Sequence, residues 1–302
     1  MNVSAPSMCQ QVGSAFDRVY GPACAEAEVC LSNLRVNGNV RRFIIGRMGS
    51  TGSSWLAKLL NGHPEVYCSH EGIVAQLYPS LQINSQEIFR FIEYFAWNAK
   101  HEAYRVLGDV GSVFCWHLRW LSTFTTALLV RHPARILNTR LTVYPQSQSF
   151  AAIPPESRTC IQDLWGIDLH DYEPIDQIFL HDIWTFASQV WVLDKVDLLI
   201  RLEDLQEVEN CLRILHALTG LDYNRTLVEE ATLKRVNRRT QGSRSISEIV
   251  AGFSARQRDW YSLMLADVLP SFGYELLDET PWGKHPIQRV GYGDITEHEK
   301  TA

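Results

Sequence analysis

The chain has 302 residues, of which 46% are hydrophobic and 21% charged, and its formal net charge at pH 7 is −6. This is the composition of a globular protein with one large domain or two small ones, and the acidic balance argues against a broad surface for nucleic acid or another polyanion. The apolar runs are far too short to span a bilayer, and the first 40 residues have neither the basic start nor the apolar core of a signal peptide, so we expect a cytoplasmic protein without a membrane span.

The predicted elements alternate between strands and helices. Short runs rich in Ile, Leu and Val predict strands covered by helices on both faces: Arg42–Gly46, Glu65–Ser69, Arg105–Asp109, Ala127–Arg131 and Asp197–Leu202. Helical patterns cover Ser53–Asn61, Ser85–Lys100, Ala134–Tyr144, Asp176–Lys195 (with Trp184 and Trp191 on its apolar side), Glu207–Leu218 and Ala255–Val268, the last with Ser254 as N-cap. This order predicts an α/β fold: a central, mostly parallel sheet of about five strands, flanked by helices, with its ligand at the carboxyl ends of the strands.

Two stretches do not fit this alternation. Residues 1–40 are expected to be an irregular lead-in or a small helix, and residues 145–175 show no clear periodicity. Long loops in compact domains are often functional lids, and three aromatic side chains favour a partly ordered lid here: Tyr144, Trp165 and Tyr172. We expect a single domain over residues 41–280, with a substrate lid at 145–175 and a C-terminal tail at 281–302.

The sequence GRMGSTGSSW, residues 46–55, follows the first predicted strand and leads into a helix. A nucleotide-triphosphate loop needs Lys where this chain has Ser53, so hydrolysis of ATP or GTP by the usual route lacks its main charge. Backbone N–H groups at the helix start, together with neighbouring hydroxyls and glycines, suit a phosphate or sulfate ester. A plain strand-to-helix turn with serine caps is the alternative. The residues expected to hold the anion are Gly49, Ser50, Thr51, Gly52, Ser53 and Ser54.

Arg131 ends the fourth predicted strand, and Pro133 favours the start of the next helix. Thr139 lies about two turns into that helix, where it could reach a ligand beside the guanidinium, whose planar fork suits a phosphate monoester. The alternative is an arginine paired with a surface carboxylate. Basic residues also cluster over residues 231–244 without an acidic residue among them, which indicates either a small anionic ligand or a solvated loop.

These blocks together resemble the sulfotransferases that use 3′-phosphoadenosine 5′-phosphosulfate (PAPS). FIIGRMGSTGSSWLAKLLNGHPEVYC resembles their 5′-phosphosulfate loop, with matches at residues 52–55 and at His63-Pro64. TALLVRHPARILNTRL resembles their 3′-phosphate motif, with Arg131 and Thr139 in the matching places. VDLLIRLEDL and RDWYSLMLADVLPSFGYE resemble two later blocks, so that the resemblance covers roughly residues 41–275.

The resemblance implies a P-loop NTPase-like sulfotransferase fold that binds PAPS, transfers its sulfonate to a hydroxyl or amine of a small-molecule acceptor, possibly a secondary metabolite, and releases PAP. It also implies that Trp55 stacks on adenine and that Arg238 or Arg239 closes over the 3′-phosphate. The family has Lys or Arg where this chain has Ser50, so Arg47 is the candidate replacement. No metal is expected, and the seven cysteines, without paired Cys-x-x-Cys spacing, favour reduced thiols over a zinc site.

The acceptor requires a base, and EVYCSHEG places His70 and Glu71 just beyond the second predicted strand. Glu71 matches the spacing of the family's base, whereas histidine is a natural base near pH 7. We favour Glu71, with His70 as its orienting partner or as the base itself; His117 is a weaker candidate, and an ordinary loop is the alternative.

Two other functions stay open at this point. One is a P-loop kinase or NTPase with an altered loop, and the other is a catalytically weak PAP(S)-binding protein of the same fold, which Ser50 keeps in consideration.

Overall fold

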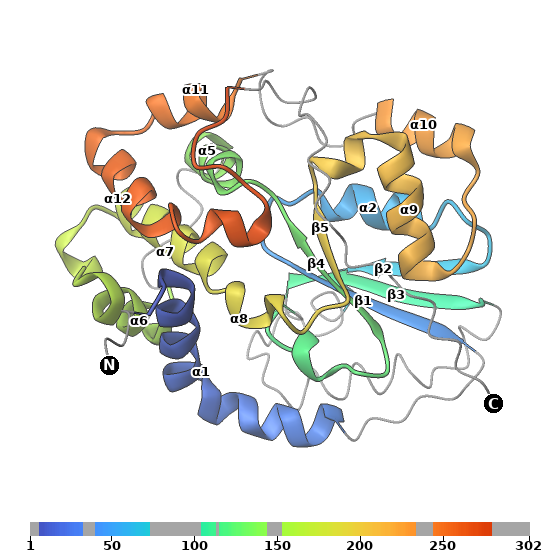
Figure 1. Ribbon diagram of the computed structural model, residues 1–302, viewed down its shortest axis with the longest axis horizontal. Helices are drawn as coiled ribbons and strands as arrows, with labels where there is room; N and C mark the ends of the chain where they lie inside the picture. Colours follow the sequence, from blue (N-terminus) through green and yellow to red (C-terminus); the bar gives the residue numbers. More distant parts are fainter. Residues whose placement is uncertain are drawn as a thin grey trace, which may run out of the picture.

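The computed structural model describes residues 6–32, 40–72, 104–112, 115–143, 153–233 and 244–279. In this part of the chain the centre is a five-stranded sheet of order β2-β3-β1-β4-β5, and each neighbouring pair is parallel. The strands are β1 Arg41–Arg47, β2 Val66–His70, β3 Val106–Gly111, β4 Thr125–Val130 and β5 Leu198–Arg201. Helices flank the sheet (Figure 1), and the prediction of an α/β fold with a parallel sheet is confirmed.

The described helices are α1 Met8–Ser32, α2 Ser53–Leu60, α5 Pro133–Val143, α6 Pro155–Trp165, α7 Pro174–Ala187, α8 Val190–Leu193, α9 Val208–Thr219, α10 Arg225–Leu233, α11 Ile246–Ala251 and α12 Ala255–Leu265. Short 3₁₀ turns complete the elements: η3 Leu118–Trp120, η5 Leu169–Asp171, η6 Asp204–Gln206 and η7 Leu269–Phe272. Among these helices, none combines the length and hydropathy that crossing a membrane requires. The predicted helix Ser85–Lys100 and the predicted tail 281–302 lie outside the described residues.

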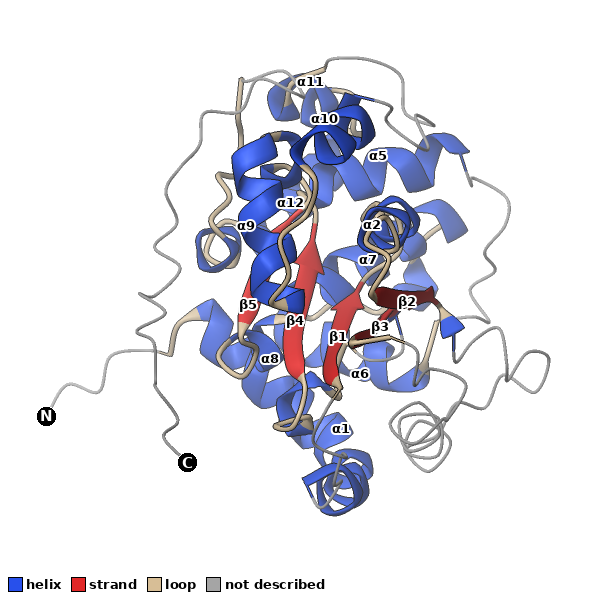
Figure 2. Cartoon of the chain, turned by 90° about the vertical axis from the view of Figure 1, so that its right-hand side faces the viewer, coloured by secondary structure: helices blue, strands red, loops and turns tan. Residues whose placement is uncertain are grey.

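The two faces of the sheet belong to two separate cores. Phe43 and Ile45 of β1 belong to the core that contains residues of α2, α9 and α10. Ile44, between them, belongs to the core that contains residues of α1, α5, α6, α7, α8, α11 and α12. Figure 1 shows α2, α9 and α10 on one side of the strands and α1, α6, α7 and α12 on the other, and Figure 2 shows neighbouring strands pointing the same way. Successive residues of each strand therefore enter different cores, which explains the nearly continuous apolar runs in the sequence.

The strand order makes the end of β1 the candidate position for a ligand site. β1 lies between β3 and β4, while α2 carries the chain from β1 to β2 at the edge of the sheet. In open α/β sheets, a crevice forms outside the carboxyl ends of the strands where neighbouring connections leave in different directions. The loop after β1 is at this position.

The prediction of one helix over Asp176–Lys195 is wrong in one respect: the structure has two helices, α7 and α8, separated at Ser188 and Gln189. The Ser188 hydroxyl donates to the Thr185 carbonyl (3.1 Å), and the Gln189 side chain donates to the Phe186 carbonyl (3.2 Å). Side chains that bond the backbone in this way compete with helical hydrogen bonds. Both tryptophans predicted on the apolar side, Trp184 and Trp191, are buried in the core as expected.

Two helices occupy stretches that the sequence left undefined. α1 spans 25 residues of the expected lead-in, and its Val12 and Phe16 are buried in the main core. α6 and η5 lie within the stretch 145–175; α6 begins with Pro155 in its first turn and ends at Gly166, whose φ of 66° is left-handed. Both are ordinary helix-boundary residues. Residues 144–152 lie outside the described part, and a lid there stays a prediction.

The helix start predicted at Ser254 is confirmed. The Ser254 hydroxyl accepts from the backbone N–H of Gln257 (3.2 Å), and the Gln257 side chain accepts from the backbone N–H of Ser254 (3.1 Å). This reciprocal capping box satisfies two backbone donors at the start of α12.

Gly108 lies where the Phe43 ring crosses β3. A Cβ at this position would come within 1.9 Å of the ring, which is fully buried. Gly108→Ala should lower the free energy of unfolding by about 1–3 kcal/mol, the usual cost of overpacking a core. Urea unfolding measures it. Gly13→Ala is the control, because a Cβ in that part of α1 meets nothing within 4 Å; equal stability of the two variants would contradict the prediction.

Candidate active site

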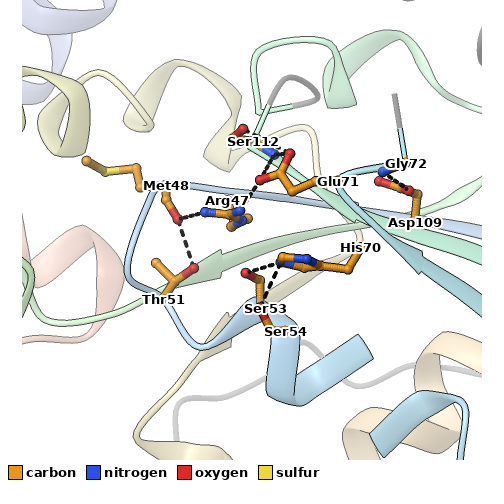
Figure 3. A network of polar contacts seen from close by, with 10 residues as sticks. All are labelled: Arg47, Met48, Thr51, Ser53, Ser54, His70, Glu71, Gly72, Asp109 and Ser112. Carbon is orange, nitrogen blue, oxygen red and sulfur yellow. Dashed lines mark hydrogen bonds and ion pairs between the residues drawn. The ribbon is translucent and has the colours of Figure 1, made fainter. Parts of the chain in front are cut away.

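Side chains from separate strands meet at the carboxyl edge of the sheet. The loop that begins at Met48 follows β1, the pair His70 and Glu71 ends β2, Ser112 follows β3, and Arg131 follows β4. Figure 3 shows the part of this group around Arg47, with Glu71 on one side and the loop and the start of α2 on the other. The candidate site is therefore assembled from strands that are distant in sequence but neighbours in the sheet.

The loop between β1 and α2 turns at Ser50 and Gly52, which have positive φ values of 63° and 78°. Gly49 lies in the same turn without a left-handed φ. Thr51 is 1% exposed, and its hydroxyl donates to the Met48 carbonyl (2.9 Å). This bond stabilises the loop internally. At position 52 a side chain is also excluded, because a Cβ there would come within 2.7 Å of the Leu202 side chain.

The start of α2 presents backbone N–H donors that suit an anion. Gly52 is the N-cap and provides no side-chain hydrogen bond to the helix. The first backbone N–H groups of a helix have no partners within the helix, and they carry the positive end of the helix dipole. The N–H groups of Ser53 and Ser54 therefore form a suitable site for a phosphate or sulfate group.

His70 connects the end of β2 to the start of α2. Its Nε2 lies 2.9 Å from the Ser53 hydroxyl oxygen and 3.2 Å from that of Ser54. Partial burial lowers the pKa of His70, and the positive charge of Arg47 lowers it further, so the ring is neutral at pH 7. Both hydroxyls, which the sequence predicts to face the anion, are thus within hydrogen-bonding distance of the ring.

Glu71 forms an ion pair with Arg47. The Arg47 Nη2 bonds the Glu71 Oε1, and its Nη1 donates to the Met48 carbonyl (3.0 Å). Glu71 also accepts from the backbone N–H (3.3 Å) and the hydroxyl (3.2 Å) of Ser112, and its φ of 55° is left-handed. Burial lowers the pKa of Arg47 to about 10, so the guanidinium keeps its charge at neutral pH. The side chain expected to serve the anion thus faces the expected base, and both roles stay predictions.

Asp109 is a member of this group that the sequence analysis missed. Its side chain is fully buried, and its Oδ2 accepts from the Ser69 hydroxyl and from the backbone N–H of Gly72 (3.1 Å). Burial raises the pKa of Asp109 to about 7, although the bonds from Ser69 and Gly72 and the charge of Arg47 lower it. The signal in the sequence was an acidic residue within the apolar run VLGDVG.

Arg131 reaches the loop from the end of β4. Its Nη1 donates to the Ser50 carbonyl (3.0 Å), and burial lowers its pKa. Thr139 is buried on α5, and its hydroxyl donates to the Arg135 carbonyl (2.8 Å). The structure thus brings Arg131 to the loop, while the assignment of Thr139 to the same ligand stays a prediction.

The basic cluster of residues 231–244 is described only at its ends. Arg238 and Arg239 lie outside the described residues, so their assignment is untested. Arg244 donates to the Asn138 side-chain oxygen on α5 (2.9 Å), next to Thr139. The C-terminal end of the cluster therefore reaches the helix that follows Arg131.

Trp55, which was expected to stack on adenine, is half-buried in the first turn of α2. Its Nε1 donates to the Ala231 carbonyl on α10 (3.0 Å), and the ring packs against the core that α2 shares with α9 and α10. Stacking on adenine stays a prediction. Over the described ranges, no three or more His, Cys, Asp or Glu side chains gather in a group that could hold a metal ion.

No protein-family model matches this sequence, and no curated protein matches it. Among solved structures, a sulfotransferase from Alicyclobacillus acidocaldarius is similar over 78% of this chain and 95% of its own, with 12% sequence identity and a TM-score of 0.39. An overlap of this quality does not establish a shared function. A functional assignment therefore depends on the residues of the site.

Proposed function

We propose that the protein transfers a sulfonate group from PAPS to a hydroxyl or amine of a small-molecule acceptor and releases PAP. The observation that carries this proposal is the meeting of Arg131 with the loop at Ser50, next to the uncapped start of α2. A fixed cation and a helix N-terminus then serve one ligand that carries more than one anionic group. The sequence blocks that resemble PAPS-dependent enzymes contain these same residues.

In this proposal the backbone N–H groups of the loop and of the first turn of α2 hold the 5′-phosphosulfate. Arg131 holds the 3′-phosphate, with Thr139 and one of Arg238 and Arg239 beside it, and Trp55 lies against adenine. When bound, the cofactor supplies an activated sulfonate on a good leaving group, and no metal takes part. The protein's contribution is to position the reactants and to balance charge.

Glu71 or His70 takes the proton of the acceptor's hydroxyl or amine. His70 is neutral at pH 7 and can accept a proton directly. Glu71 is engaged by Arg47, and an anion at the loop would compete with Glu71 for that guanidinium. Binding of the cofactor would then free the Glu71 carboxylate to act as the base. We place the protein in the cytoplasm and its acceptor beneath residues 145–175.

A second candidate is a protein of the same fold that binds PAP or PAPS and transfers slowly. The Arg47–Glu71 ion pair favours it, because the replacement for the missing basic residue at Ser50 is engaged elsewhere. A kinase or NTPase is the third candidate, and Ser53 in place of lysine argues against it.

Thermal unfolding with separate additions of PAP, PAPS, ATP with Mg²⁺ and GTP with Mg²⁺ tests the proposal. A ligand at a hundred times its dissociation constant stabilises the folded protein by about 2.7 kcal/mol, so PAP and PAPS should raise the melting temperature and the triphosphates should not. Stabilisation by ATP alone would support a kinase. If PAP stabilises but no PAP is released from PAPS with any of a panel of phenols, alcohols and amines, the slow-transfer candidate is favoured.

A further inference from the structure

The buried carboxyl group of Asp109 forms hydrogen bonds to the turn that carries His70 and Glu71. In the sheet register Asp109 lies opposite Ser69 of β2, one residue before that pair. Its Oδ2 accepts from the Ser69 hydroxyl on one side of the turn and from the Gly72 backbone N–H on the other. One buried oxygen thus connects the two ends of a four-residue turn in which Glu71 has the left-handed φ of 55°.

These two hydrogen bonds alone do not require an acid. The amide oxygen of an asparagine also accepts two hydrogen bonds, and it avoids the cost of burying a charge. In the described part of the chain, the other oxygen of Asp109 has no hydrogen-bond partner, and its side chain is 0% exposed. Burial of an unpaired carboxyl oxygen costs free energy. Its presence here therefore indicates that the acid has a role beyond these two hydrogen bonds.

The charge of Asp109 acts on Arg47. Burial is the main cause that lowers the pKa of Arg47, and the negative charge of Asp109 opposes it. Arg47 forms its ion pair with Glu71, and its Nε has no hydrogen-bond partner among the described residues. Among the described residues, Asp109 also raises the pKa of Cys68 of β2, and burial keeps that thiol protonated. Ionised Asp109 therefore places a second negative charge near the Arg47–Glu71 pair.

We propose that Asp109 is a positioning residue for sulfonate transfer: its ionised carboxylate accepts from Ser69 and Gly72 and so fixes the turn that places His70 and Glu71. The hold on the turn is a property of the fold, whereas the effect on transfer rests on the proposed function.

Because the pKa of Asp109 is raised to about 7, the group is protonated below that pH and ionised above it. Asp109→Asn copies the neutral form at every pH. We expect single-turnover release of PAP from PAPS, with a phenol that the wild type uses, to match the wild type at pH 6 and to fall about tenfold below it at pH 8. The KM for PAPS should stay within about threefold.

Asp197→Asn is the matched control, because Asp197 accepts from the backbone N–H (2.8 Å) and hydroxyl (2.9 Å) of Thr126 at the opposite edge of the sheet. Its pH profile should follow the wild type. Ser69→Ala keeps the carboxyl group but removes a bond that lowers its pKa, so the midpoint near pH 7 should move upward. A wild-type pH profile in folded Asp109→Asn, or an unmoved midpoint in Ser69→Ala, overturns the role in transfer.

Hydrogen exchange of the Gly72 amide is the measurement that needs no cofactor. At pH 8 a neutral amide replaces a charged acceptor in Asp109→Asn, so exchange at Gly72 should become at least about threefold faster, and Asp197→Asn should leave it unchanged. If wild type fails to bind PAP, the proposed function is lost but this result still tests the turn. Asp109→Ala removes the acceptor altogether, and unchanged exchange at Gly72 in that folded variant overturns the hold on the turn.

Discussion

Arg47→Ala is expected to slow single-turnover sulfonate transfer by roughly a hundredfold or more and to change the affinity for PAP by no more than about threefold. The sulfonate carries negative charge that must be balanced as its bond to the phosphate breaks, and Ser50 supplies no charge. Arg47 is at the carboxyl end of the central strand, and it stays charged at neutral pH although burial lowers its pKa to about 10. PAP lacks the sulfonate, so its binding should be nearly independent of this arginine.

Arg105→Ala is the matched control. Arg105 forms an arginine–glutamate pair with Glu65 (2.9 Å), but both side chains are exposed. Glu71→Gln separates two explanations: if Arg47 acts only by holding Glu71, the double variant is no slower than Glu71→Gln, whereas an independent contribution makes the losses multiply. A rate for Arg47→Ala equal to that of Arg105→Ala would show that the required cation comes from another residue.

Arg131→Ala is expected to weaken PAP binding by about 2–4 kcal/mol, which corresponds to roughly a 30- to 1,000-fold higher dissociation constant. Its guanidinium donates to the Ser50 carbonyl and so lies beside the loop. Losing a charged group that bonds a phosphate costs binding free energy of this size. The dissociation constant of Arg131→Lys for PAP should lie between those of the wild type and Arg131→Ala, because lysine keeps the charge but lacks the planar guanidinium. Calorimetric titration with PAP measures these constants, and urea unfolding checks that each variant is folded.

Two variants make this result specific. Lys58→Ala removes an exposed positive charge from α2 and should leave PAP affinity unchanged. Thr139→Val should weaken PAP binding by less than about tenfold, since the Thr139 hydroxyl already donates to the Arg135 carbonyl and a neutral hydrogen bond contributes little. Wild-type affinity in folded Arg131→Ala would remove Arg131 from the 3′-phosphate site.

Several predictions from the sequence depended on local signals, and the structure confirms them. The strands were recognisable because both faces of a buried parallel sheet require apolar side chains, so that Phe43, Ile44 and Ile45 are consecutive. α12 was placed by its N-cap, which acts on the next few residues only. Local signals failed for α1 and α6. The apolar side of α1 is stabilised by residues from other elements that bury it, and these are distant in sequence. α6 has ordinary boundary residues, but its hydrophobic periodicity is weak.

The sequence by itself determined the alternation of strands and helices, the glycine- and serine-rich loop after the first strand, and most of the candidate residues near it. The tertiary structure alone decided their partners. It paired Arg47 with Glu71, which is 24 residues away, and Arg131 with Ser50, which is 81 residues away. It also gave Ser50, a non-glycine residue, a left-handed φ and brought Asp109 to the turn that carries His70 and Glu71. The physical reason is that hydrogen bonds, charge and burial act over a few ångströms in space, and only the pairing of β2, β3, β1 and β4 brings these residues within that distance.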